Sequence, residues 1–217
     1  MIAYKFLPKE FAPDAARGRF KISLLTFFNR TEDRSIRDED DGKTVGFTDR
    51  PFVIDENPEN AVLRERMERY GWIKVSNGGK VISSGASSRY EMTLPPAYIL
   101  SLSSDINCPK WLTGDEPKDA VVKIRGLRIL ANAVAQRHAD ILGPALVRRV
   151  IYTQRRVDLL QRDLDPLSAF HKRPAFSDEA EIRIIFMAKA TSPAEWFITE
   201  CDGLENILSW EMRPQLA

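Results

Sequence analysis

The sequence contains few of the residues that most often carry metal and redox chemistry. Among its 217 residues there are only two cysteines and two histidines. Cys108 and Cys201 lie far apart in the chain, so they do not form the closely spaced pairs of zinc or dithiol sites. A His-Glu-x-x-His motif is also missing. These absences argue against the common zinc-enzyme patterns and predict free thiols in a reducing compartment.

Long apolar runs are missing as well. No segment approaches the roughly 20 apolar residues that a membrane-spanning helix needs. Residues 1–9 have no long apolar stretch of the kind that signal peptides contain. Lys and Arg total 32 against 31 Asp and Glu, so no global charge attracts the chain to nucleic acid or to an anionic membrane. We therefore expect a cytoplasmic protein that does not bind membranes.

The common nucleotide and hydrolase signatures do not occur either. The sequence has neither the Gly-x-Gly-x-x-Gly pattern of dinucleotide sites nor the Gly-x-Ser-x-Gly pattern of serine hydrolases. With only two histidines, imidazole has few opportunities to act as a base. Carboxylates are therefore the remaining candidates for catalysis, since a carboxylate beside a ribose stabilises an oxocarbenium-like transition state.

The residues that are present predict one mixed domain. Hydrophobic residues make up 43% and charged residues 29% of the chain, which is ordinary for a globular protein. Segments typical of strands and of helices follow one another without strict alternation, repeats or long linkers. We expect a single α+β domain over residues 1–217, with mixed or antiparallel central β-sheets flanked by helices. The densely charged segment 30–50 is expected to be an exposed loop within it.

The main candidate site lies where two carboxylates precede an apolar run. Glu179 and Glu181 are one residue apart, and on a strand residues i and i+2 share a face. We expect both carboxylates and Arg183 on one face, with Ile182 and Ile184 on the other. One interpretation is a solvated edge in which Arg183 neutralises one glutamate, which is the commoner outcome. The other is a carboxylate pair at the mouth of a cleft.

A second candidate is the strand expected over residues 97–104. Alternation places Ser101 and Ser103 on one face and Tyr98 and Leu100 on the other. Two serines among apolar neighbours can satisfy backbone groups at a strand end, or they can hydrogen-bond a ligand. The sequence leaves both interpretations open.

Segment 148–156 is locally basic and contains four arginines. Such a cluster can contact phosphates, or it can balance the acidic residues of segment 30–50. It supports an alternative function as a non-catalytic module that binds nucleic acid or protein. A nuclease-like site is a third hypothesis, in which Glu179, Glu181 and Lys172 act with a divalent metal.

The order of these segments resembles a broad bacterial family of uncharacterised proteins and looks like the ADP-ribosyltransferase fold. The resemblance is carried by an early strand Tyr4-Lys5-Phe6, a central Ser101-Leu102-Ser103 and a late Glu179-Ala180-Glu181-Ile182-Arg183. That fold has Arg or His on its first strand, Ser or Tyr on a middle strand and Glu on a late strand. Here the first strand offers Lys in place of Arg or His.

The resemblance implies an enzyme that transfers ADP-ribose from NAD to a macromolecular acceptor, either protein or nucleic acid. Its implied biological role is that of a toxin or phage-defence effector. NAD would be the substrate, and the resemblance implies no metal. Six residues receive roles by position: NAD binding by Tyr4 or Lys5, framing of the nicotinamide ribose by Ser101 and Ser103, catalysis by Glu181 and activation of the acceptor by Glu179.

Overall fold

The computed structural model describes most of the chain, and it divides the chain into two compact units. The described residues are 1–28, 43–48, 51–69, 79–84, 88–93, 96–108, 118–153, 156–158, 168–189 and 194–212. The first unit comprises 1–42, 94–154 and 169–217, and the second comprises 43–93 and 155–168. The sequence led us to expect one α+β domain over 1–217. The structure differs because the described strands of the second unit pair with one another.

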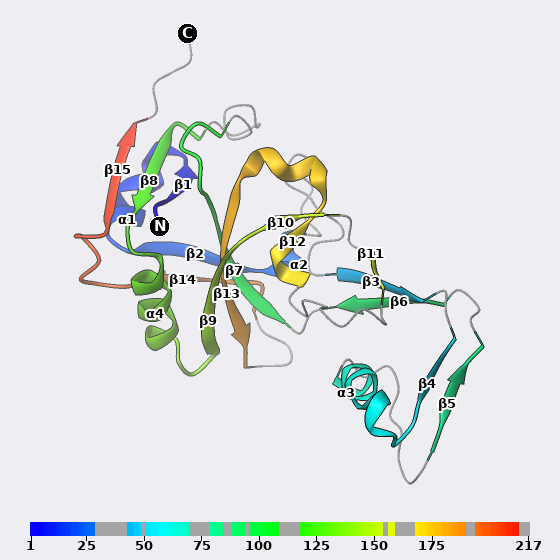
Figure 1. The fold of residues 1–217 in the computed structure, drawn as a ribbon. Helices are drawn as coiled ribbons and strands as arrows, with labels where there is room; N and C mark the ends of the chain where they lie inside the picture. Colours follow the sequence, from blue (N-terminus) through cyan, green and yellow to red (C-terminus); the bar gives the residue numbers. More distant parts are fainter. Residues whose placement is uncertain are drawn as a thin grey trace. The chain divides into compact units, whose positions relative to one another are not determined.

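The first unit is built on an eight-stranded sheet in which the paired strands are antiparallel. Its main path runs β14-β2-β7-β1-β8-β15, while β13 pairs with both β7 and β9 (Figure 1). This confirms a mixed α+β chain with an antiparallel central sheet. The strands are β1 (Ala3–Leu7), β2 (Arg19–Leu24), β7 (Ala97–Ser103), β8 (Ala120–Ile124), β9 (Leu142–Arg149), β13 (Glu181–Ala188), β14 (Trp196–Glu200) and β15 (Leu208–Met212).

Strand β7 is the centre of the sheet because it pairs with three other strands. Strand β13 pairs with the whole of β7, from Glu181 opposite Ser103 to Met187 opposite Ala97. Strand β2 pairs with the first half of β7, and β1 pairs with its last residue, Ser103. The end of β7 therefore brings β1 and β13 together, although these strands are far apart in the sequence.

Alternation along β7 and β13 separates an apolar face from the face that carries the polar residues of the candidate site. Leu100, Leu102, Ile182 and Ile184 are buried in the main core, together with residues of helices α1 (Ala12–Ala16) and α4 (Leu127–Arg137). These residues confirm the expected apolar faces of the two strands. The polar residues of the candidate site alternate with them, so that they project to the opposite face of the sheet.

Short elements complete the first unit near the start of β13. Strands β10 (Ile151–Tyr152) and β12 (His171–Lys172) pair in parallel, which sets Tyr152 opposite Lys172. The 3-10 helix η5 (Pro174–Glu179) then leads into β13. The other short elements are η1 (Lys9–Phe11), α2 (Leu25–Phe28) and η4 (Ser168–Phe170), the last beginning at the boundary with the second unit.

The second unit contains two small sheets. Strand β3 (Lys43–Thr48) pairs with β6 (Ser88–Thr93) and with β11 (Arg156–Asp158), and β4 (Phe52–Ile54) pairs with β5 (Val81–Ser83). Its helices are η2 (Pro58–Asn60) and α3 (Ala61–Arg69). The expected loop over 30–50 is thus wrong for 43–48, because strand pairing outweighs the charged composition of its surroundings. Residues 30–42 and 49–50 lie outside the described residues.

Gly18 joins α1 to β2 with a backbone that only glycine adopts without strain. Its φ is 95°, and a Cβ there would lie 2.1 Å from the Cys201 carbonyl oxygen. We expect Gly18→Ala to lower the free energy of unfolding by on the order of 3 kcal/mol. The matched control is Gly203→Ala, where φ is 77° but nothing lies within 4 Å of the added Cβ. Its expected cost is about 1 kcal/mol. Equal losses in urea denaturation would contradict the packing argument.

Candidate functional site

The two candidate carboxylates do not lie on one strand. Pro174 begins η5, Glu179 ends it, and Glu181 is the first residue of β13. Ala180 between them has a left-handed backbone with φ of 45°, which no other described non-glycine residue shares. The expectation that Glu179 and Glu181 share a strand face is therefore wrong, because the chain turns sharply at Ala180.

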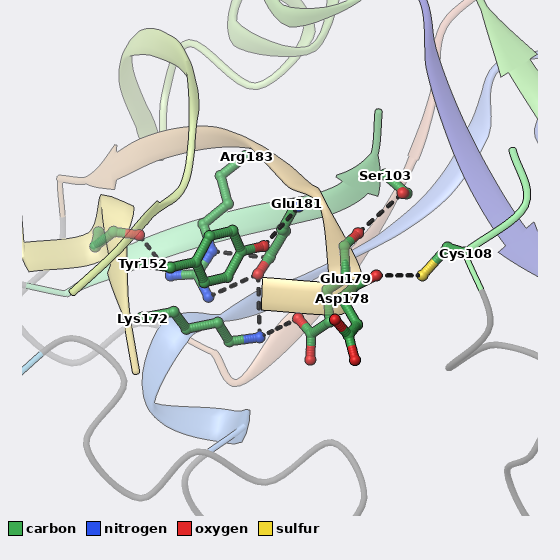
Figure 2. Close-up of polar contacts among 9 residues, drawn as sticks. Ser103, Cys108, Tyr152, Lys172, Asp178, Glu179, Glu181 and Arg183 are labelled. Atoms are coloured by element: carbon green, nitrogen blue, oxygen red, sulfur yellow. Dashed lines mark hydrogen bonds and ion pairs between the residues drawn. The ribbon is translucent and has the colours of Figure 1, made fainter. Parts of the chain in front are cut away.

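A buried lysine brings the two carboxylates together instead. The ammonium of Lys172 lies 2.5 Å from Glu179 Oε2 and 3.0 Å from Glu181 Oε2 (Figure 2). Lys172, Glu179 and Glu181 are only 6%, 3% and 4% exposed. The interpretation of a solvated edge is therefore wrong as well. These are buried charges, which persist in proteins only when they are paired.

Arg183 completes this ionic cluster from the next position on the same face of β13. Its Nε lies 2.8 Å from Glu181 Oε1 and its Nη2 lies 3.2 Å from Oε2, the fork geometry of a bidentate pair. A third nitrogen, Nη1, donates to the carbonyl oxygen of Ala169 at 2.5 Å. The sequence predicted Arg183 beside Glu181 on one face, and the structure confirms that placement.

The cluster keeps Glu181 ionised. Burial alone would raise the pKa of its carboxyl group, but the charges of Arg183 and Lys172 outweigh that effect. Hydrogen bonds from Arg183 and from the Ser101 side chain add to the stabilisation of the anion. The pKa of Glu181 therefore lies well below its ordinary value, so that this carboxylate is a fixed negative charge at neutral pH.

Donors from the end of β7 hold the backbone of the turn. Ser103 Oγ donates to the Glu179 carbonyl at 2.9 Å, and the Ser104 amide and hydroxyl donate to the Ala180 carbonyl at 2.8 and 2.9 Å. Cys108 Sγ donates to the Asp178 carbonyl at 3.1 Å (Figure 2). Ser103 was predicted to frame a ribose, and the structure places its hydroxyl on the backbone of the turn. This network fixes the strained conformation of Ala180 and the position of both carboxylates.

Tyr152 is a site residue that sequence reasoning missed. Its hydroxyl oxygen accepts a hydrogen bond from the backbone N–H of Glu181 at 2.7 Å (Figure 2). Burial raises its pKa to about 12, with further contributions from the Glu181 and Glu179 charges. No signal in the sequence around Tyr152 indicates this role, because it arises from the pairing of β10 with β12.

Lys5 connects the first strand, β1, to the site around Glu181. Lys5 Nζ donates to the backbone carbonyl of Ser101 at 3.0 Å, and the Ser101 side chain hydrogen-bonds Glu181. Tyr4, the other predicted NAD-binding residue of this strand, packs instead against a small cluster that contains Phe6. Lys5, Ser101 and Glu181 are therefore brought together by the three neighbouring strands β1, β7 and β13.

Lys5 is expected to behave as an amine of unusually low basicity. Burial of its ammonium lowers its pKa from 10.5 to about 8, and the nearby Lys118 adds to the shift against the opposing charge of Glu181. Competitive labelling with trace acetic anhydride, followed by peptide mass spectrometry, should give a reactivity midpoint near pH 8 for Lys5. An ordinary lysine titrates near pH ~10.4. The acetylated peptide is assigned to Lys5 by its absence in Lys5→Arg. A reactivity midpoint near that of an ordinary lysine would contradict the buried environment of Lys5.

The other hypotheses find less in the described part of the chain. No group of three or more His, Cys, Asp and Glu residues that could hold a metal ion occurs there. In the basic segment, Arg148 and Arg149 are exposed at the end of β9, Arg156 belongs to the second unit, and Arg155 lies outside the described residues. Nor does any helix among the described residues have the length and apolar character needed to cross a bilayer.

The site thus consists of the ionic cluster, the turn at Ala180 and the hydrogen bond from Lys5 on β1 to Ser101. Compared with protein-family models, with curated proteins and with solved structures, the chain matches none of them.

Proposed function

We propose that the protein is an ADP-ribosyltransferase-like enzyme that breaks the bond between nicotinamide and ribose in NAD and transfers ADP-ribose to a macromolecular acceptor. One observation carries the proposal: Lys5, Ser101 and Glu181 meet where β1, β7 and β13 lie side by side. The fold that the chain resembles has Arg or His on its first strand, Ser or Tyr on a middle strand and Glu on a late strand. This chain has Lys5, Ser101 and Glu181 there, so Lys5 departs from the pattern of the first strand.

The state of Glu181 suits the electrostatic part of this reaction. When the glycosidic bond breaks, nicotinamide leaves with the bonding electrons and the ribose carbon C1′ becomes cationic. A carboxylate that stays ionised, as the lowered pKa of Glu181 implies, stabilises that cation and does not act as a proton donor. Because Arg183 and Lys172 hold the carboxylate in place, little reorganisation is needed as the charge develops.

A ligand that donates a hydrogen bond to Glu181 needs an unoccupied acceptor position on its carboxylate. A carboxylate offers about four lone-pair positions. In the structure the Glu181 carboxylate accepts hydrogen bonds from Nε and Nη2 of Arg183 and from the Ser101 side chain, and it forms an ion pair with the Lys172 ammonium. Ser101 is the one uncharged donor among these. In our proposal its hydroxyl rotates away, and a ribose hydroxyl takes its place on Glu181.

The acceptor supplies the nucleophile for the second half of the reaction. Its oxygen or nitrogen forms the new bond to C1′, and its proton passes to a base. Glu179 is our candidate for that base, because Lys172 holds its side chain beside Glu181. Protonation removes the negative charge of Glu179, so proton transfer weakens its ion pair with Lys172.

Transfer of label from NAD tests the proposed function. The protein is incubated with a cell lysate and with NAD labelled in its adenylate part. We expect label to appear on protein or nucleic acid with the wild type and to be absent with Glu181→Gln. Equal labelling by the two proteins, or none with the wild type, would contradict the proposal. Digestion with protease and with nuclease identifies the class of the acceptor.

A further inference from the structure

We propose that the Tyr152 hydroxyl is a second ligand-contacting group of this site, donating its proton to the same ribose hydroxyl that approaches Glu181. The inference rests on the proposed function and assigns Tyr152 a role that the resemblance does not imply. It makes Tyr152 and Glu181 together a recognition element for a sugar hydroxyl.

Strand pairing fixes where the phenol lies. Tyr152 on β10 is opposite Lys172 on β12, and both residues reach Glu181 from there. Lys172 contacts the carboxylate of Glu181, while the oxygen of Tyr152 accepts the backbone N–H of the same residue at 2.7 Å. The phenol is therefore held next to the proposed catalytic residue by a hydrogen bond in which it is the acceptor.

That arrangement leaves the phenolic proton available. A tyrosine hydroxyl has one proton to donate, and a backbone N–H cannot accept it. Among the described residues, no acceptor takes the proton of Tyr152, whose hydrogen bond to Glu181 uses only its oxygen. Burial and the adjacent carboxylates raise its pKa to about 12, so the donor persists at neutral pH. Tyr152 is only half-buried, so part of its side chain is exposed.

A hydroxyl is the ligand group that this pair fits. Glu181 is an anion and only accepts hydrogen bonds, whereas the Tyr152 hydroxyl has a proton to donate. A ligand hydroxyl does both, since it donates to the carboxylate and accepts from the phenol. A carbonyl or a carboxylate lacks the proton for Glu181, and an ammonium lacks the lone pair for Tyr152. The pair therefore favours a hydroxyl over these groups, and in the proposed function that hydroxyl belongs to the ribose.

The test compares NAD with an analogue that lacks the 2′-hydroxyl of the nicotinamide ribose, using titration calorimetry of the full chain. We expect wild-type protein to bind the deoxy analogue about 30-fold more weakly than NAD, as for loss of hydrogen bonds to a charged site. In Tyr152→Phe this ratio of affinities should fall to about 5-fold, because the hydrogen bond from the phenol to the 2′-hydroxyl is lost. Tyr98→Phe is the matched control, since the Tyr98 hydroxyl donates to the Ala194 carbonyl.

Loss of the phenol also leaves the Glu181 N–H without its partner, so a second measurement separates recognition from structure. Replacing Tyr152 with 3,5-difluorotyrosine keeps the accepting oxygen but lowers the pKa of the phenol by several units. The affinity of the fluorinated protein for NAD should then decrease as the pH rises through that pKa. The affinity of the wild type should not decrease over the same pH range. An unchanged ratio in Tyr152→Phe, or a flat pH profile in the fluorinated protein, would overturn the inference alone. Absence of NAD binding by the wild type would contradict the proposed function as well.

Discussion

Arg183→Met is expected to lower the free energy of unfolding by about 3–5 kcal/mol, the typical loss when one partner of a buried ion pair is removed. Arg183 is 1% exposed, and its guanidinium forms a forked pair with Glu181. Methionine fills much of the same volume but leaves the Glu181 carboxylate with Lys172 as its remaining cation. The Ala169 carbonyl also loses its donor.

Urea denaturation of the full chain, followed by near-ultraviolet circular dichroism, measures this loss. The matched control is Arg128→Met, because Arg128 is exposed on α4 and its replacement should change stability by less than about 0.5 kcal/mol. If Arg183→Met were as stable as this control, the ionic cluster would not contribute to the folded state as described.

Glu181→Gln is expected to lower the rate of nicotinamide release from NAD by about 10²–10³-fold, the typical loss when one charge-stabilising group of an active site is removed. Glutamine keeps the shape of the side chain and removes the negative charge that opposes the developing cation. Release of nicotinamide is measured by chromatography under single-turnover conditions, so that the acceptor does not limit the rate.

This variant also removes the counter-charge of Arg183 and Lys172, so its folding needs a separate control. The comparison is made at a temperature where circular dichroism shows both proteins folded. Glu205→Gln, at an exposed position, is the matched variant and should react at the wild-type rate. A Glu181→Gln protein that is folded and fully active would contradict the catalytic role of Glu181.

Strand periodicity accounts for the part of the site that the sequence predicts. The alternation of Ile182, Arg183 and Ile184 requires only that the segment be a strand, and the structure confirms that Arg183 lies beside Glu181. The same reasoning gave the polar face of β7 with Ser101. These inferences are local, because a period of two residues is a property of the backbone.

The remaining features depend on contacts between distant segments. Nothing near Glu179 predicts the left-handed turn at Ala180, a conformation that glycine usually occupies. The meeting of Tyr152 and Lys172 follows from the parallel pairing of two-residue strands, which are too short to show any periodicity. The burial of Glu181 reverses the expectation of a solvated edge, because β13 lies between β7 and β9.

The division into two units could not be predicted from composition. The second unit includes segment 43–48, which follows an acidic cluster in the sequence. It also includes segment 155–168, which is separated from the rest of the unit by more than 60 residues. Strands β3 and β11 pair across this separation. Such long-range pairing leaves no mark on the local sequence, which is why the single domain over 1–217 was the expectation.

In the proposed function, NAD binds where β1, β7 and β13 meet. A crystal structure of the protein with NAD tests this claim most directly. We expect the nicotinamide ribose to lie against Glu181, with its hydroxyl in place of the Ser101 side chain and with Lys5 in contact with the dinucleotide. A dinucleotide bound elsewhere, with the ionic cluster undisturbed and remote from it, would contradict the account.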